Sequence, residues 1–96
     1  MRRAEVPATL SAQVDGLRRH GVRSLFLFGS VARDEAGPGS DVDLLVDFEA
    51  PPGFDRYMDL KFFLEDLLQT RVDLVMRGAL RPRWRTRIEA EALRVA

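Results

Sequence analysis

The most informative stretch of this sequence is Ser40-Asp41-Val42-Asp43-Leu44-Leu45-Val46-Asp47-Phe48. Its apolar and acidic residues alternate at a period of two, which is the period of a β-strand, so Asp41 and Asp43 share one face. Their Cα atoms are then about 6.6 to 6.8 Å apart, close enough for both carboxylates to flank a metal ion. The apolar run at 44–46 indicates an interior strand, where unpaired carboxylates are costly. The alternative is a solvated edge strand whose acids prevent aggregation.

A glycine-serine pair, Gly29-Ser30, precedes Asp41 by a gap of ten residues. It ends the apolar run at 24–28, which predicts a strand buried on both faces. Glycine lets backbone amides approach an anion, and Ser30 adds a hydroxyl at the expected start of a helix, a position that favours phosphate. Alone, the pair is more typical of a helix cap. Together with two carboxylates, it predicts metal-assisted phosphoryl or nucleotidyl transfer.

A third acid, Asp73, interrupts the β-prone run Arg71-Val72-Asp73-Leu74-Val75-Met76. Taken alone, this residue is more typical of a surface position on an edge strand. If its strand pairs beside the one that carries Asp41 and Asp43, three carboxylates converge. Two of them then hold divalent metal, and the third accepts a proton from an attacking hydroxyl.

Helical patterns surround these strands. Four helices are predicted: one that carries Val6, Leu10, Val14 and Leu17 and ends at His20-Gly21, a short one at 30–35, an amphipathic one at 57–68, and one after Pro82. The helical spacing of their apolar residues and the glycine cap support these limits. Strands that alternate with helices predict an α/β layered domain.

The closing helix combines an apolar stripe with crowded arginines. The stripe consists of Leu80, Trp84, Ile88 and Ala92, and the arginines are Arg81, Arg83, Arg85 and Arg87. Cations in a first turn oppose the helix dipole, so these arginines are either solvated or face an anionic partner or a nucleotide phosphate. Trp84 belongs either to the core or to an interface, where tryptophan is enriched.

Composition indicates one small domain over residues 1–96. The chain has 96 residues, 46% of them hydrophobic, and no cysteine, so it has no disulfide framework and no thiolate metal site. It has no apolar run long enough to cross a membrane and no signal-peptide core at its start, so we expect a cytoplasmic protein. The net charge is zero, but an acidic centre lies between basic ends. That centre attracts metal and disfavours direct nucleic-acid binding.

The combined motif resembles a known family. Gly29-Ser30, the ten-residue gap, and Asp41-Val42-Asp43 followed by Leu44-Leu45-Val46 are similar to the signature of the DNA polymerase β-like nucleotidyltransferase superfamily. Gly-Ser-Val-Ala-Arg at 29–33, Ser40-Asp41 and the run at 71–75 resemble, more narrowly, the minimal nucleotidyltransferases, the MntA-type antitoxins encoded beside HEPN-domain toxins. One departure is Asp34, which stands where these proteins commonly have glycine.

This resemblance implies a fold, a site and an activity. The fold is a small mixed β-sheet flanked by helices, and the cofactor is Mg²⁺, held by Asp41 and Asp43, with Asp73 as third ligand or as base. Gly29 and Ser30 contact the triphosphate of ATP, assisted by Arg33 and Ser40. Similar antitoxins transfer AMP from ATP to a tyrosine of the cognate HEPN ribonuclease and so neutralise it. The ordinary alternative for Arg33 is a salt bridge.

The size of the chain bears on its partners, because a core of this length leaves nothing for a separate acceptor domain. We therefore expect a hetero-oligomer in which another protein brings the acceptor. Two alternatives stay open. The chain neutralises its partner by binding alone, or it is the catalytic subunit of a two-protein enzyme that modifies a small hydroxylated molecule.

Overall fold

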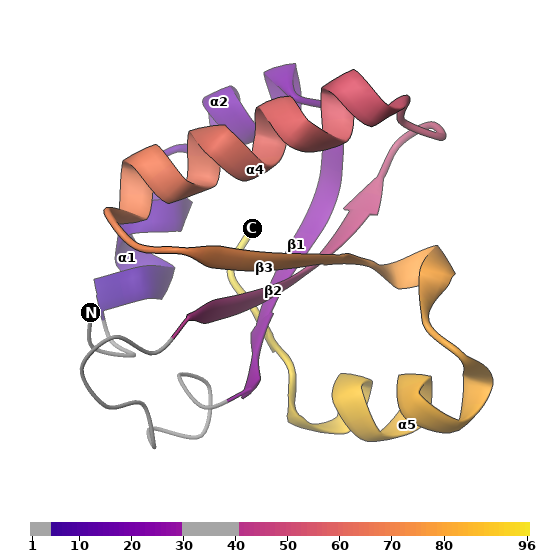
Figure 1. Ribbon diagram of the computed structural model, residues 1–96. Helices are drawn as coiled ribbons and strands as arrows, with labels where there is room; N and C mark the ends of the chain where they lie inside the picture. Colours follow the sequence, from indigo (N-terminus) through magenta and orange to yellow (C-terminus); the bar gives the residue numbers. More distant parts are fainter. Residues whose placement is uncertain (1–4, 30–40) are drawn as a thin grey trace.

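The computed structural model describes residues 5–29 and 41–96. In chain order, its elements are α1 (Glu5–Ser11), α2 (Val14–Arg19), β1 (Val22–Phe28), β2 (Val42–Phe48), α4 (Phe54–Leu68), β3 (Val72–Met76), the 3-10 helix η1 (Arg77–Ala79), α5 (Pro82–Glu91) and β4 (Leu93–Arg94). Figure 1 shows these elements as helices on both sides of a central sheet. The short helix predicted at 30–35 and the turn after it lie outside the described residues.

The four strands form one mixed sheet in the order β3-β2-β1-β4. Strand β1 pairs antiparallel with β2 and with β4, whereas β2 pairs parallel with β3. The prediction of a small mixed sheet flanked by helices is therefore confirmed. The acid-bearing strand β2 is interior, as its apolar run indicated, and β3 forms one edge.

The hydrophobic core lies between the sheet and one layer of helices. Helices α1, α2 and α4 cover one face of the sheet, and α5 lies against the other (Figure 1). On α4, the core residues are four positions apart: Leu60, Leu64 and Leu68. On β2, they are two positions apart: Val42, Leu44 and Val46. The intervening β2 residues therefore face α5, and among them is Asp43.

The face covered by α5 is only partly closed. No residue of α5 is buried, and Trp84 is 44% exposed, so of the two positions considered for this tryptophan the structure rules out the core. Phe26 and Phe28 of β1 are half-buried, and burial of β1 on both faces is thus incomplete. Among the described residues, the helix that covers that side is α5, which is short and rich in arginine.

One further prediction, for the first helix, needs correction, and residues 93–95 show features that were not predicted. The first helix is two helices, because the Gln13 N–H bonds to the Leu10 carbonyl at 3.0 Å and tightens the chain into a turn. The Ser11 hydroxyl next to this turn donates to the Val95 carbonyl at 3.0 Å. Beyond α5, the chain adds strand β4 and buries Val95, neither of which was predicted.

The end of α2 was predicted correctly. His20 caps the helix, its Nδ1 lies 2.9 Å from the Gly16 carbonyl oxygen, and Gly21 follows with a φ of +83°. His20 is therefore a capping residue. None of the described helices is long and apolar enough to span a membrane.

Candidate active site

Two of the predicted acids lie side by side on neighbouring strands. In the parallel pairing of β2 with β3, Asp43 is the register partner of Asp73. Adjacent strands are about 4.7 to 4.9 Å apart, and register partners point to the same face, so the two side chains leave the sheet together. Asp43 is half-buried and Asp73 is exposed. The predicted convergence of the two strands is thus present.

Gly29 packs directly against Asp43. It follows Phe28, the register partner of Asp43 on β1, and has a φ of +75°. A Cβ atom built at Gly29 would lie 2.0 Å from Asp43 Oδ2 and 2.9 Å from its Cγ. Only glycine therefore leaves room for the Asp43 carboxylate where the predicted phosphate-binding turn begins.

Asp41 lies at the same end of the sheet but has a different neighbour. Its Oδ1 is 3.2 Å from Nε of Arg71, in an exposed ion pair just before β2 and β3 begin. Within residues 5–29 and 41–96, no three His, Cys, Asp or Glu side chains lie close enough together to hold one metal ion. The structure thus brings together Asp43 and Asp73, with Asp41 turned to Arg71, and the three-acid ligand set stays a prediction.

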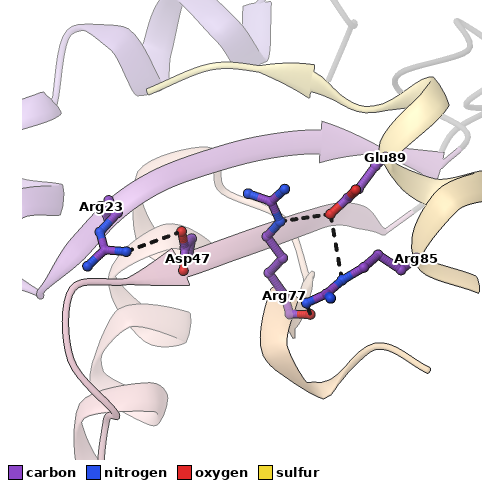
Figure 2. A network of polar contacts seen from close by, with 5 residues as sticks. All are labelled: Arg23, Asp47, Arg77, Arg85 and Glu89. Atoms are coloured by element: carbon purple, nitrogen blue, oxygen red, sulfur yellow. Dashed lines mark hydrogen bonds and ion pairs between the residues drawn. The ribbon is translucent and has the colours of Figure 1, made fainter. Parts of the chain in front are cut away.

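The last acid of β2, Asp47, has a structural partner. Its Oδ2 lies 3.9 Å from Arg23 on the neighbouring strand β1 (Figure 2). Asp47 is on the face of Asp43 but four residues farther along the strand, near its other end. It therefore serves as an internal comparison for the acids of the candidate site.

The residues around Asp43 fit a divalent cation. Two carboxylates in register repel each other unless a cation compensates. Carboxylate oxygens are the hard ligands that Mg²⁺ accepts, and Gly29 keeps one of the two carboxylates free of steric crowding. The predicted phosphate and nucleotide contacts Ser30, Arg33 and Ser40, and the unusual Asp34, lie outside the described residues.

A polar network attaches α5 to the end of β3. Arg77 donates from Nε to Glu89 Oε1 at 2.7 Å, and Arg85 lies 3.8 Å from the same oxygen (Figure 2). The Arg77 guanidinium also lies 5.8 Å from the centre of the Phe26 ring. Arg77 and Glu89 line a pocket of about 160 Å³ on the Asp43 face of the sheet, together with Phe26, Leu45 and Ala92.

Loss of this network should loosen α5 more than it lowers global stability. We expect Glu89→Gln to reduce the free energy of unfolding by only about 0.2 to 1 kcal/mol, because the paired side chains are a third or more exposed. Trp84 is the single tryptophan and lies on α5, so its fluorescence reports on this helix. A soluble quencher should reduce this fluorescence more strongly in Glu89→Gln than in the wild type. Arg87→Gln, an exposed change on the same helix, should leave quenching unchanged. Equal quenching in all three proteins would contradict this role.

Two residues near the site had no sequence signal. Tyr57 of α4 donates its hydroxyl proton to the Leu74 carbonyl at 2.5 Å, and Glu65 Oε2 accepts the Val72 N–H at 3.0 Å. The sequence placed both residues only within the amphipathic helix predicted at 57–68, without a role for either. Their contacts depend on how α4 packs on β3, which no local pattern encodes.

The hydroxyl of Tyr57 should ionise at a higher pH in the folded protein than in the unfolded protein. Burial raises the pKa of its hydroxyl, and the Asp73 carboxylate raises the pKa further. The folded pKa lies above the unfolded value of about 10. The contribution of the neutral hydroxyl to the free energy of unfolding is therefore fully present below pH ~10 and is lost as the pH rises through the folded pKa. Tyr57 is the single tyrosine, so tyrosinate absorbance should show a higher midpoint in folded than in urea-unfolded protein. Equal midpoints would contradict the burial of this hydroxyl and its proximity to Asp73.

Comparison with known proteins assigns the family. Residues 10–95 match the profile of the nucleotidyltransferase domain. The chain belongs to this family. Among members of the nucleotidyltransferase family, protein adenylyltransferase MntA of Thermococcus cleftensis is 47% identical over 78 residues, which cover 80% of this chain and 79% of that protein. The resemblance inferred from the Gly-Ser and Asp-Val-Asp motifs is thereby confirmed.

Two solved structures share this fold. One described as a minimal nucleotidyltransferase has a TM-score of 0.85 at 41% identity and covers 97% of this chain and 95% of its own. A chain from the complex of a tri-AMPylated Shewanella oneidensis HEPN toxin with an MNT antitoxin has a TM-score of 0.67 at 17% identity, over 94% of this chain and 71% of its own. At that identity, the second likeness shows the fold alone.

Proposed function

We propose that this chain is an antitoxin that transfers AMP from ATP to a tyrosine of a cognate HEPN-domain ribonuclease. The observation that carries the chemistry is the pairing of Asp43 with Asp73 beside Gly29. The protein acceptor is supported by the 47% identical relative named as a protein adenylyltransferase. The HEPN partner is supported by the solved complex of an AMPylated HEPN toxin with an antitoxin of the same fold.

In this proposal, Asp41 and Asp43 supply the carboxylates that bind Mg²⁺, and Asp73 serves either as a third ligand or as the base. Bound Mg²⁺ would offset the negative charge of the ATP phosphates. The tyrosine oxygen forms a bond to the α-phosphorus, the bond from that phosphorus to the bridging oxygen breaks, and pyrophosphate leaves. Asp73, exposed at the edge strand, accepts the tyrosine proton if it does not serve as the third metal ligand.

The nucleotide contacts form a second part of the proposal. Gly29 ends β1 beside Asp43, so a triphosphate bound at this turn lies next to the carboxylates. Ser30, Arg33 and Ser40 are proposed to contact the phosphates. Reactants held in this way need little further reorganisation before transfer.

Neutralisation of the toxin tests the proposal. The chain and the HEPN protein encoded beside it are produced together, and growth and ribonuclease activity are measured. We expect the wild-type chain to restore growth and the Asp41→Ala/Asp43→Ala variant to fail although it still co-purifies with the toxin. Full neutralisation by this variant would overturn the catalytic proposal in favour of neutralisation by binding alone.

A further inference from the structure

The outer edge of β3 is covered by side chains of α4 at the position of Asp73. Among the described strands, β3 lies at one end of the sheet and pairs only with β2, so every second peptide group points away from β2. Such edge groups need partners. Two of them are satisfied by α4, through Glu65 at the Val72 N–H and Tyr57 at the Leu74 carbonyl.

These two hydrogen bonds lie immediately before and after Asp73. Residues 72 and 74 direct their peptide groups outward to α4, whereas those of Asp73 point inward to β2, its register neighbour. The backbone at Asp73 is therefore held from both sides. Because the Asp73 side chain is exposed, its position depends on this backbone rather than on surrounding packing.

We propose that Tyr57 and Glu65 are positioning residues, an inference that rests on the proposed function. They hold the backbone of β3 in place on both sides of Asp73 and thereby keep its carboxylate beside Asp43. Both act through the backbone and neither touches the reacting atoms. They lie about two helical turns apart on α4, so together they set the angle at which the strand passes the helix. A single bond would leave the strand free to pivot about it.

The support behind these bonds is rigid. Helix α4 is anchored by Leu60, Leu64 and Leu68, all at most 1% exposed, and these residues lie between or beside the two polar ones. The bond from Glu65 is charge-assisted, which makes it stronger than a neutral one. A misplacement of 1 Å at a reacting group can lower a rate about 100-fold.

The chain offers matched variants for a test of this inference. Tyr57→Phe removes the hydroxyl and keeps the ring, Glu65→Ala removes the acceptor, and Glu65→Gln keeps an oxygen that can accept the same N–H. Asp66→Ala, an exposed change at the next position of α4, is the control. Initial rates of AMP transfer to the HEPN protein are measured over a range of ATP concentrations, with each variant below its unfolding temperature.

We expect Tyr57→Phe and Glu65→Ala each to lower kcat about tenfold while KM for ATP stays within about twofold, because proton acceptance and reactant alignment matter in the transition state. Glu65→Gln should restore most of kcat, and Asp66→Ala should match the wild type. In an Asp73→Asn background, Tyr57→Phe should cause no further loss. A full further loss in that background, or an unchanged kcat in both single variants, would overturn the positioning role.

A readout independent of ATP and metal completes the test. Hydrogen exchange of the Val72 amide should be faster in Glu65→Ala than in the wild type or Glu65→Gln, and unchanged exchange would remove the basis for the inference. A wild-type chain that transfers no AMP overturns the proposed function, and the positioning role falls with it. An active wild-type chain whose variants keep their full kcat overturns the positioning role alone.

Discussion

Asp43→Asn should abolish detectable AMP transfer, with a loss of at least about 100-fold in kcat. Asp43 is the half-buried acid that lies in register with Asp73 and against Gly29, so the change removes a negative ligand from the centre of the site. Metal-assisted stabilisation of a transferring phosphoryl group is worth several kcal/mol, and each 1.36 kcal/mol corresponds to about tenfold in rate. The initial rate of transfer of labelled AMP at saturating ATP is the measurement.

Asp47→Asn is the matched control for this prediction. Asp47 lies on the same strand and the same face, but it pairs with Arg23 near the other end of β2 (Figure 2). We expect the control variant to retain wild-type transfer and both variants to co-purify with the HEPN protein. Equal losses in the two variants would show that β2 acids matter in general and that the Asp43–Asp73 pair has no special role.

Gly29→Ala should damage both stability and activity. A left-handed φ of +75° costs a residue with a Cβ about 1 to 2 kcal/mol, which thermal or urea unfolding can measure. The new methyl group would also overlap Asp43 Oδ2 and force the carboxylate to move. Because a shift of about 1 Å can lower a rate about 100-fold, we expect a loss of that order in kcat.

The control for this variant is Gly78→Ala. No atom lies within 4 Å of a Cβ built at Gly78, and its φ is not in the left-handed region. We expect unfolding and AMP transfer close to wild type for this protein. If Gly29→Ala transfers AMP as fast as Gly78→Ala, then the contact between Gly29 and the Asp43 carboxylate has no part in the site.

The sequence predicted the parts of the fold that depend on local pattern. The period-two alternation at 41–48 identified β2, and the apolar run within it identified an interior strand, because burial on two sides leaves a composition that is visible in the sequence. Asp73 was placed beside Asp43 on the condition that their strands pair. The structure supplies that pairing.

Features that depend on tertiary contacts were not predictable. Strand β4 has two residues, too few for a periodic signal, and forms because β1 offers an open edge. The ion pair of Asp41 with Arg71 follows from the pairing of β2 with β3. The hydrogen bonds of Tyr57 and Glu65 with β3 follow from the packing of α4 on that strand. Propensity and spacing carry no information about such contacts.

Intact-mass spectrometry of the HEPN protein tests the central claim most directly. The protein is incubated with this chain, ATP and Mg²⁺, in parallel with the Asp41→Ala/Asp43→Ala variant. The account predicts a gain of one or more AMP units, located on tyrosine by fragmentation, that the variant does not produce. An unchanged mass with every one of the four nucleoside triphosphates, in a mixture where the two proteins form a stable complex, would contradict it.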